Sequence, residues 1–200
     1  MKRTFAIGSD TALVAEIDVK RELAAEGWIS VNMNTEKGNF PNVDLLAVRE
    51  DVVHYIQVKA GYGETLTPEG KSVSHPDCLF LGRAEGWLTN KTPFFNGKPG
   101  PLMCSIVVAV HVTRERSRFV VLPVGLAEKI ARTGTEEWYN VPKKNGGKRK
   151  PGFDARPRFI SLPKRRALAK EMICMDTLRA YENRWDVLLE EHEKLRDSKA

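Results

Sequence analysis

The most constraining feature of this chain is a pair of neighbouring strands, predicted at residues 42–48 and 53–59. Each segment is rich in β-branched and apolar residues, and only a short polar turn separates the two. Strands joined by so short a turn must pair antiparallel. If the turn is centred at about Glu50, Asp44 and Gln57 are close to direct cross-strand neighbours. The pair therefore brings an acid and an amide together at one end of a hairpin.

The second strand of this pair has two chemically different faces, because side chains alternate along a strand. Ile56 and Val58 are apolar and are expected to face the core. Gln57 and Lys59 then share the other face, with Lys59 at the end of the strand beside a cleft. His54 lies on the core side and is expected to be structural. An acid, an amide and a lysine in this arrangement can surround one divalent cation.

A helix predicted from Ser9 to about Glu26 precedes the strands and carries a carboxylate among apolar residues. Ser9 or Asp10 can cap its start, and Gly27 is expected to end it. On the helical wheel Glu16 lies within about 60° of four apolar side chains. Because burying an unpaired charge is costly, Glu16 either meets a cation or bends to solvent beside Lys20. The four side chains are Ala12, Leu13, Val19 and Leu23.

The remaining pattern predicts an α/β domain. A half-buried strand at 28–33 precedes the pair, and three strands with short connections form an antiparallel meander. A mixed sheet flanked by helices is the expected architecture. The predicted organisation is a core at 1–135, a basic loop segment at 136–162, and a long C-terminal helix at 163–200 packed on the same domain. Within the core we expect an insertion at about 61–101, strands at 104–112 and 118–123, and a short helix at 126–132.

Positive charge is concentrated in one part of the chain. The formal net charge is +6, yet residues 143–170 alone contain 11 Lys or Arg and one acidic residue, Asp154. A concentrated basic segment suits a polyanion, although a solvated tether is the alternative. The candidate nucleic-acid-binding residues are Lys143, Lys144, Lys148, Arg149, Lys150, Arg156 and Arg158.

The cysteines and the hydrophobic pattern bear on the compartment. Three cysteines stand far apart, without the spacing of a zinc site or a disulfide framework. No signal peptide opens the chain, and no apolar run of about 20 residues could span a membrane. These features lead us to expect a cytoplasmic protein.

Glu16, Asp44, Gln57 and Lys59 together resemble the PD-(D/E)xK nuclease superfamily, which includes restriction enzymes and Holliday-junction resolvases. The resemblance covers roughly residues 8–60. Asp44 matches the first carboxylate of the motif, and Lys59 matches its lysine. Gln57 departs from the usual acid, as in a Gln-x-Lys variant found in some restriction enzymes. Glu16 matches a helix carboxylate of the resolvase-like branch.

The resemblance implies a restriction-endonuclease-like fold and metal-dependent hydrolysis of DNA phosphodiester bonds. Asp44, Gln57 and Glu16 would hold Mg²⁺ or Mn²⁺, and Lys59 would orient or activate the attacking water. DNA is the implied partner, RNA stays open, and a homodimer would let both strands be cut.

Other readings of these residues stay open. Asp44 could be a turn-forming residue and Lys59 an ordinary strand-end lysine. A nuclease fold with an inactive site could still bind DNA, and an adaptor could bind a protein through the insertion and the C-terminal helix.

Overall fold

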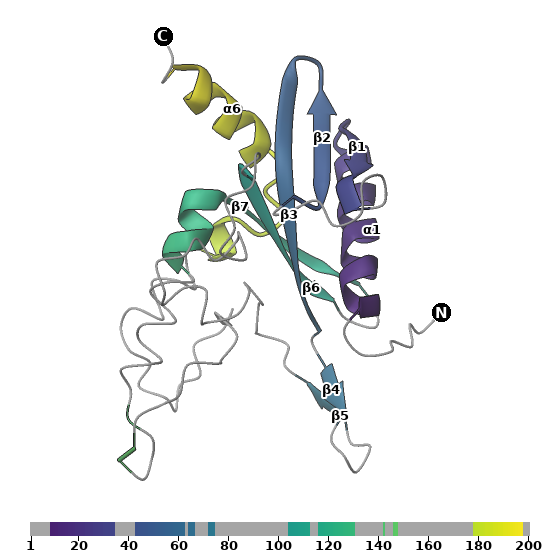
Figure 1. Cartoon of the computed structure of the whole chain (residues 1–200), viewed down its shortest axis with the longest axis vertical. Helices are drawn as coiled ribbons and strands as arrows, with labels where there is room; N and C mark the ends of the chain where they lie inside the picture. The colour runs from purple at the N-terminus through teal and green to yellow at the C-terminus, as the bar shows by residue number, and fades with distance from the viewer. Residues whose placement is uncertain are drawn as a thin grey trace.

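The fold is a five-stranded mixed sheet with helices packed against it, as the sequence predicts (Figure 1). The strand order is β1-β2-β3-β6-β7. In this computed structural model the described residues are 9–34, 43–62, 64–66, 72–74, 104–112, 116–130, 142, 146–147 and 178–197. The sheet strands are β1 (Ile29–Asn32), β2 (Leu45–Arg49), β3 (Val52–Tyr62), β6 (Ile106–Val112) and β7 (Arg118–Pro123).

The first three strands form the expected antiparallel meander, and their register agrees with the turn predicted at Glu50. Leu45 pairs with Ile56, which places Asp44 opposite Gln57 at the next position. β6 then pairs parallel to β3, and β7 pairs antiparallel to β6. In the predicted insertion, β4 (Glu64–Leu66) and β5 (Ser72–Ser74) form a two-stranded hairpin. Residues 75–103 lie outside the described part of the chain.

The first helix, α1 (Ser9–Ala25), ends as the sequence predicts. Gly27 has φ of +81°, a left-handed conformation that suits glycine. Its backbone N–H donates to the carbonyl of Ala24 at 3.1 Å, and Trp28 N–H donates to the carbonyl of Leu23 at 2.8 Å. This pair of bonds is a Schellman motif, which turns the chain directly into β1.

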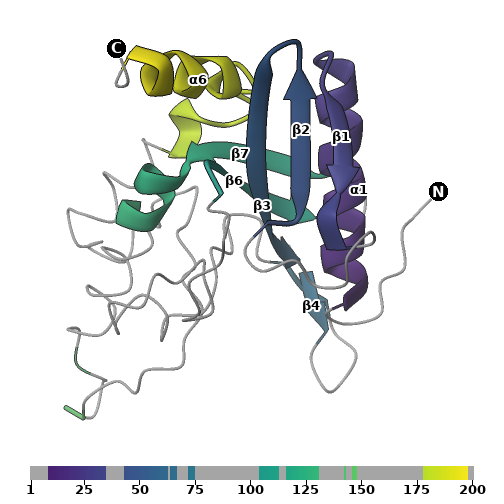
Figure 2. The same ribbon diagram turned by 45° about the horizontal axis from the view of Figure 1, so that its top comes forward.

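The core is divided between the two faces of the sheet. On one face, α1 and α6 (Val187–Asp197) pack against apolar side chains of β2, β3, β6 and β7. On the other face, a short helical segment at 124–130 and Leu178 cover β6 and β7. β6 is buried along its whole length, as expected of a central strand. Figure 2 shows α1 alongside β1, and α6 at the end of the sheet where β2 turns into β3.

The prediction of a continuous C-terminal helix is wrong for residues 178–197. Residues 178–180 are helical, but the chain leaves the helix at Tyr181 and α6 begins only at Val187. Tyr181 O accepts from Val121 N–H at 3.1 Å, and Asn183 N–H donates to Phe119 O at 2.9 Å. This segment therefore pairs with the outer edge of β7. Backbone groups that would otherwise be unpaired at a sheet edge are satisfied in this way. Residues 163–177 lie outside the described residues.

The half-buried strand predicted at 28–33 is confirmed as β1, although its apolar side chains are on the exposed face. Trp28 is buried, but Ile29 is 72% exposed and Val31 is 39% exposed. β1 is the edge strand of the sheet, and the described helices near it pack on its other face. Hydrophobic alternation therefore identified a strand but did not show which of its faces is covered. Within the described residues, no helix combines the length and the apolar character needed to cross a membrane.

Candidate active site

Asp44 is held at the start of β2 by bonds to the strands on both sides. Its backbone N–H donates to Ile56 O at 2.9 Å, and its carbonyl accepts from Met33 N–H at 2.9 Å. The carboxylate is equally fixed. Oδ2 accepts from Val58 N–H at 2.7 Å, and Oδ1 accepts from the Asn34 amide at 3.0 Å. Because both oxygens accept hydrogen bonds from other segments of the chain, the carboxylate has a fixed orientation, which argues against a simple turn-forming role.

Glu16 reaches the same place from α1. Its side chain is half-buried, and its Oε2 accepts a 2.7 Å hydrogen bond from Asn32 Nδ2. Burial raises the pKa of Glu16, the bond from Asn32 opposes this effect, and the negative charge of Asp44 raises it further. The two carboxylates are therefore close enough to repel each other, which is the arrangement that a divalent cation stabilises.

The helix face of Glu16 differs in detail from the prediction. Ala12 and Leu13 are exposed, whereas Ala15, Val19 and Leu23 are buried. Glu16 therefore lies at the border of the buried stripe. This border position agrees with the alternative of a boundary glutamate, and its hydrogen-bond partner is Asn32, which the sequence did not indicate.

Gln57 and Lys59 lie on β3 as predicted, although neither environment was foreseen in full. Gln57 is only 7% exposed, and its Oε1 has no hydrogen-bond partner in the described structure. Lys59 is half-buried, and β3 continues past it to Tyr62, so Lys59 is not at the strand end. Burial lowers the pKa of Lys59, while Asp44 and Cys104 raise it.

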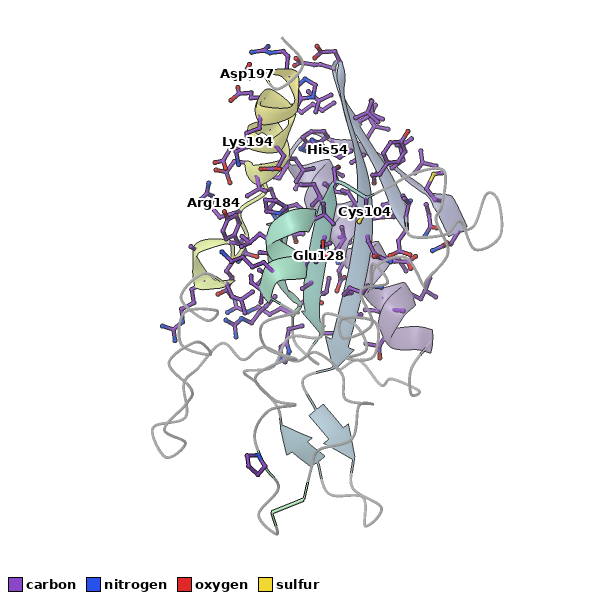
Figure 3. The ribbon with its side chains drawn as sticks, turned by 60° about the vertical axis from the view of Figure 1, so that its left-hand side comes forward. His54, Cys104, Glu128, Arg184, Lys194 and Asp197 are labelled. Carbon is purple, nitrogen blue, oxygen red and sulfur yellow. The ribbon has the colours of Figure 1, made fainter. Side chains whose placement is uncertain are left out.

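Cys104 borders this group from the residue pair that precedes β6. Burial raises the pKa of its thiol to about 12, with smaller effects from Lys59 and Asp44. The thiol is therefore protonated at neutral pH and contributes no charge to the site. Figure 3 shows Cys104 next to the β3 ribbon, and His54 further along it towards α6.

His54 is structural, as its position on the core face predicts. It is 1% exposed, and its Nε2 donates to Leu188 O at 2.6 Å, since a carbonyl oxygen can only accept. Its Nδ1 lies 2.9 Å from Ser105 Oγ. Burial lowers the pKa of His54, so the neutral ring is favoured. This histidine joins α6 to the sheet and is not a ligand of the site.

The donors present suit a hard divalent cation. Two carboxylates and an amide oxygen without a partner offer only oxygen, the donor type that Mg²⁺ and Mn²⁺ accept. No group of three or more His, Cys, Asp or Glu that could hold a metal exists among the described residues. A metal site built on Glu16 and Asp44 would therefore need a third donor of another type, such as the amide oxygen of Gln57. The seven predicted basic contact residues, from Lys143 to Arg158, all lie outside the described residues.

Sequence reasoning missed two residues of the site, Asn32 and Asn34. Both amides bond to the candidate carboxylates. Asn32 ends β1 and Asn34 follows it within two residues, so both lie where the chain leaves the sheet. That signal is weak, however, because asparagine near a strand end is also an ordinary turn former.

Comparison with known proteins gives little further information. No protein-family model matches the chain, and no curated protein matches it. Among solved structures it is similar to a bacterial homing endonuclease, with 13% identity and a TM-score of 0.47. That match covers 94% of this chain and 99% of the other. At this identity and TM-score the likeness adds nothing to the assignment of fold or function.

Proposed function

We propose that this chain is a divalent-metal-dependent endonuclease that hydrolyses DNA phosphodiester bonds. The observation that carries the proposal is the position of Asp44, whose carboxylate lies within electrostatic reach of Glu16 and also of Lys59. The buried Gln57 oxygen, opposite Asp44 in the register, supports it. The same four residues resemble the PD-(D/E)xK motif. The proposal includes a restriction-endonuclease-like fold, as the resemblance implies.

The residues that would hold the ion are Asp44, Glu16 and Gln57. Asp44 offers an oriented carboxylate, Glu16 a second charge, and Gln57 a neutral carbonyl oxygen. The ion would act as a Lewis acid on the scissile phosphate and lower the pKa of a water molecule. Burial is the main cause that raises the pKa of Glu16, and the charge of Asp44 adds to it. A cation would offset the repulsion between the two carboxylates, so this repulsion favours cation binding.

In this proposal Lys59 is the group that acts on water and phosphate, and its nearness to Asp44 supports that role. Its burial favours the neutral amine more than in solution, and Asp44 favours the cation. The net effect is a lowered pKa, so Lys59 releases its proton more readily than an exposed lysine does. In its charged form Lys59 would stabilise the negative charge that develops on the phosphate oxygens. In its neutral form it would accept a proton from the attacking water.

The basic segment would bind the DNA backbone in this scheme. Lysines and arginines at 143–158 would neutralise phosphates and release counterions. Binding should therefore weaken steeply as the salt concentration rises, by roughly one unit of logarithmic slope for each phosphate contact. RNA shares this backbone charge, so a duplex RNA of equal length belongs in the same measurement.

A DNA-binding protein with an inactive nuclease site is the second candidate function. It is favoured by Gln57, which supplies no charge where the motif has an acid. It is also favoured by the lack of three clustered His, Cys, Asp or Glu among the described residues. Fewer charged ligands mean weaker binding of the metal.

Cleavage of supercoiled plasmid and of branched DNA in Mg²⁺, Mn²⁺ or EDTA separates these candidates. Asp44→Ala and Lys59→Ala are the test variants. Asp51→Ala, in the exposed β2–β3 turn, and Lys129→Ala, on an exposed helix face, are the matched controls. An active nuclease nicks DNA only with metal, and loses nicking in the test variants alone. Salt-sensitive DNA binding by all the proteins, without any cleavage by the wild type, would favour the inactive DNA-binding protein.

A further inference from the structure

A chain of hydrogen bonds connects the two candidate carboxylates through residues that the motif does not include. Asn32 Nδ2 donates to Glu16 Oε2 at 2.7 Å. Asn34 N–H donates to Asn32 Oδ1 at 2.9 Å, and Asn34 Nδ2 donates to Asp44 Oδ1 at 3.0 Å. The bond between the asparagines is local, while the other two bonds join the segment after β1 to α1 and to the start of β2. The two carboxylates are thus connected by two amides in series.

We propose that Asn32 and Asn34 are positioning residues, which hold Glu16 and Asp44 at the separation needed to bind one divalent cation together. This inference rests on the proposed metal site and adds the residues that organise it.

The bond between the two asparagines fixes the orientation of the first amide. Because Asn32 Oδ1 accepts from the backbone of Asn34, Asn32 Nδ2 must point towards Glu16. The backbone between them is also anchored, since Met33 N–H donates to Asp44 O at 2.9 Å. The whole segment 32–34 is therefore held against Asp44 before any ligand arrives. A preorganised arrangement of this kind reduces the entropy lost on binding.

Amides suit this role better than charged groups would. A lysine or arginine at either position would neutralise a carboxylate and reduce the attraction for a cation. An acid would add repulsion to a pair that already repels. An amide donates a hydrogen bond to one oxygen of each carboxylate and leaves its negative charge in place. Partners of this kind, one layer out from the ligands, typically contribute a factor of about 10–100 in metal affinity.

The test compares Asn32→Ala and Asn34→Ala with wild type and with Ser30→Ala. Ser30 is a half-buried residue of the same short strand and serves as the matched control. Calorimetric titration with Mn²⁺, without DNA, should show a dissociation constant about 10- to 100-fold higher in both asparagine variants. Nicking of supercoiled plasmid should recover in these variants at saturating Mn²⁺. Thermal unfolding in EDTA should match that of Ser30→Ala.

A second readout needs no metal. The bond from Asn32 lowers the pKa of Glu16. Asn32→Ala should therefore raise the pKa of Glu16 in metal-free protein, as followed by carboxyl NMR titration, whereas Ser30→Ala should not. A structural role alone would not produce this selective change.

Failure of this inference can be distinguished from failure of the proposed function. If the wild type binds Mn²⁺ and nicks DNA while both asparagine variants keep its dissociation constant, the positioning role is refuted and the nuclease stands. The role is equally refuted if the two asparagine variants are less stable in EDTA than Ser30→Ala and this loss of stability is proportional to their loss of Mn²⁺ affinity. General unfolding would then explain the weaker binding. If the wild type neither binds Mn²⁺ nor nicks DNA, the site and its positioning residues are refuted together.

Discussion

Gln57→Met should make the protein more stable and, at the same time, abolish its response to metal. Gln57 is 7% exposed, and its Oε1 is buried without a hydrogen-bond partner among the described residues. A polar group in that state destabilises the fold unless a ligand satisfies it. Methionine has nearly the same length and flexibility but carries no group that needs a hydrogen bond. The substitution therefore removes the penalty together with the proposed ligand.

The size of the effect follows from the burial of that oxygen. An unsatisfied buried acceptor costs about 1–3 kcal/mol, and replacing it with an apolar group of similar shape recovers most of this free energy. In a protein of this size each kcal/mol moves Tm by about 2–4 °C. Gln57→Met should thus raise Tm in EDTA by roughly 2 °C at the lower limit and about 12 °C at the upper limit.

Thermal unfolding with and without Mn²⁺ is the assay. A ligand at about 100 times its dissociation constant stabilises the folded state by about 2.7 kcal/mol. Wild type should therefore gain stability with Mn²⁺, while Gln57→Met should gain little or none. Gln57→Glu is the matched comparison. A buried carboxylate at this position, opposite Asp44 in the register, should lower stability in EDTA at neutral pH and increase the gain with Mn²⁺.

One result would refute this reasoning. If Gln57→Met is no more stable than the wild type in EDTA, the Gln57 oxygen has a hydrogen-bond partner in solution. It would then not be held in reserve for a ligand, and the metal site would lose its third donor.

Three further predictions concern the fold. Burial lowers the pKa of His54 below its usual value of about 6.5, so as the pH falls the unfolded chain takes up a proton at this histidine before the folded protein does. The free energy of unfolding should therefore be highest above that pH and fall as the pH drops. Urea denaturation between pH 5 and 8 should show a weaker dependence of this free energy on pH in His54→Gln. Gly27→Ala should lower Tm by a few degrees because Gly27 has φ of +81°, whereas Gly125→Ala, where an added methyl group meets nothing within 4 Å, should not lower it. Glu182→Gln weakens an ion pair in which Arg118 Nε and Nη2 donate to the two Glu182 oxygens at 2.7 and 3.1 Å. The substitution should lower the free energy of unfolding by about 1 kcal/mol, and a chemical denaturation midpoint equal to that of wild type would contradict this.

Much of the fold was predictable because its signals are local. The short turn at Glu50 allows only one close pairing of its flanking strands, so Asp44 and Gln57 had to be neighbours. Gly27 has no side chain to oppose a left-handed conformation, so the end of α1 could be predicted. The continuous apolar run of β6 likewise indicated a buried central strand.

The candidate site was predictable only as a set of residues. The sequence indicated Glu16, Asp44, Gln57 and Lys59 from helix and strand periodicity and from their resemblance to a motif. It could not indicate the partner of Glu16, because that bond joins residues 16 positions apart through the packing of α1 on β1. It also could not show that the Gln57 oxygen is buried without a partner, since burial depends on every neighbouring element.

The chain by itself therefore determined its local elements and one cross-strand pairing, because turn length, capping and side-chain alternation act over short distances. Only the tertiary structure decided which strand faces are covered, where the C-terminal helix is interrupted, and how two asparagines connect two carboxylates. Tyr181 leaves its helix to meet the edge of β7, a preference that no local propensity contains. Contacts between distant segments depend on the assembled sheet, and the electrostatics of the site arise from the same contacts.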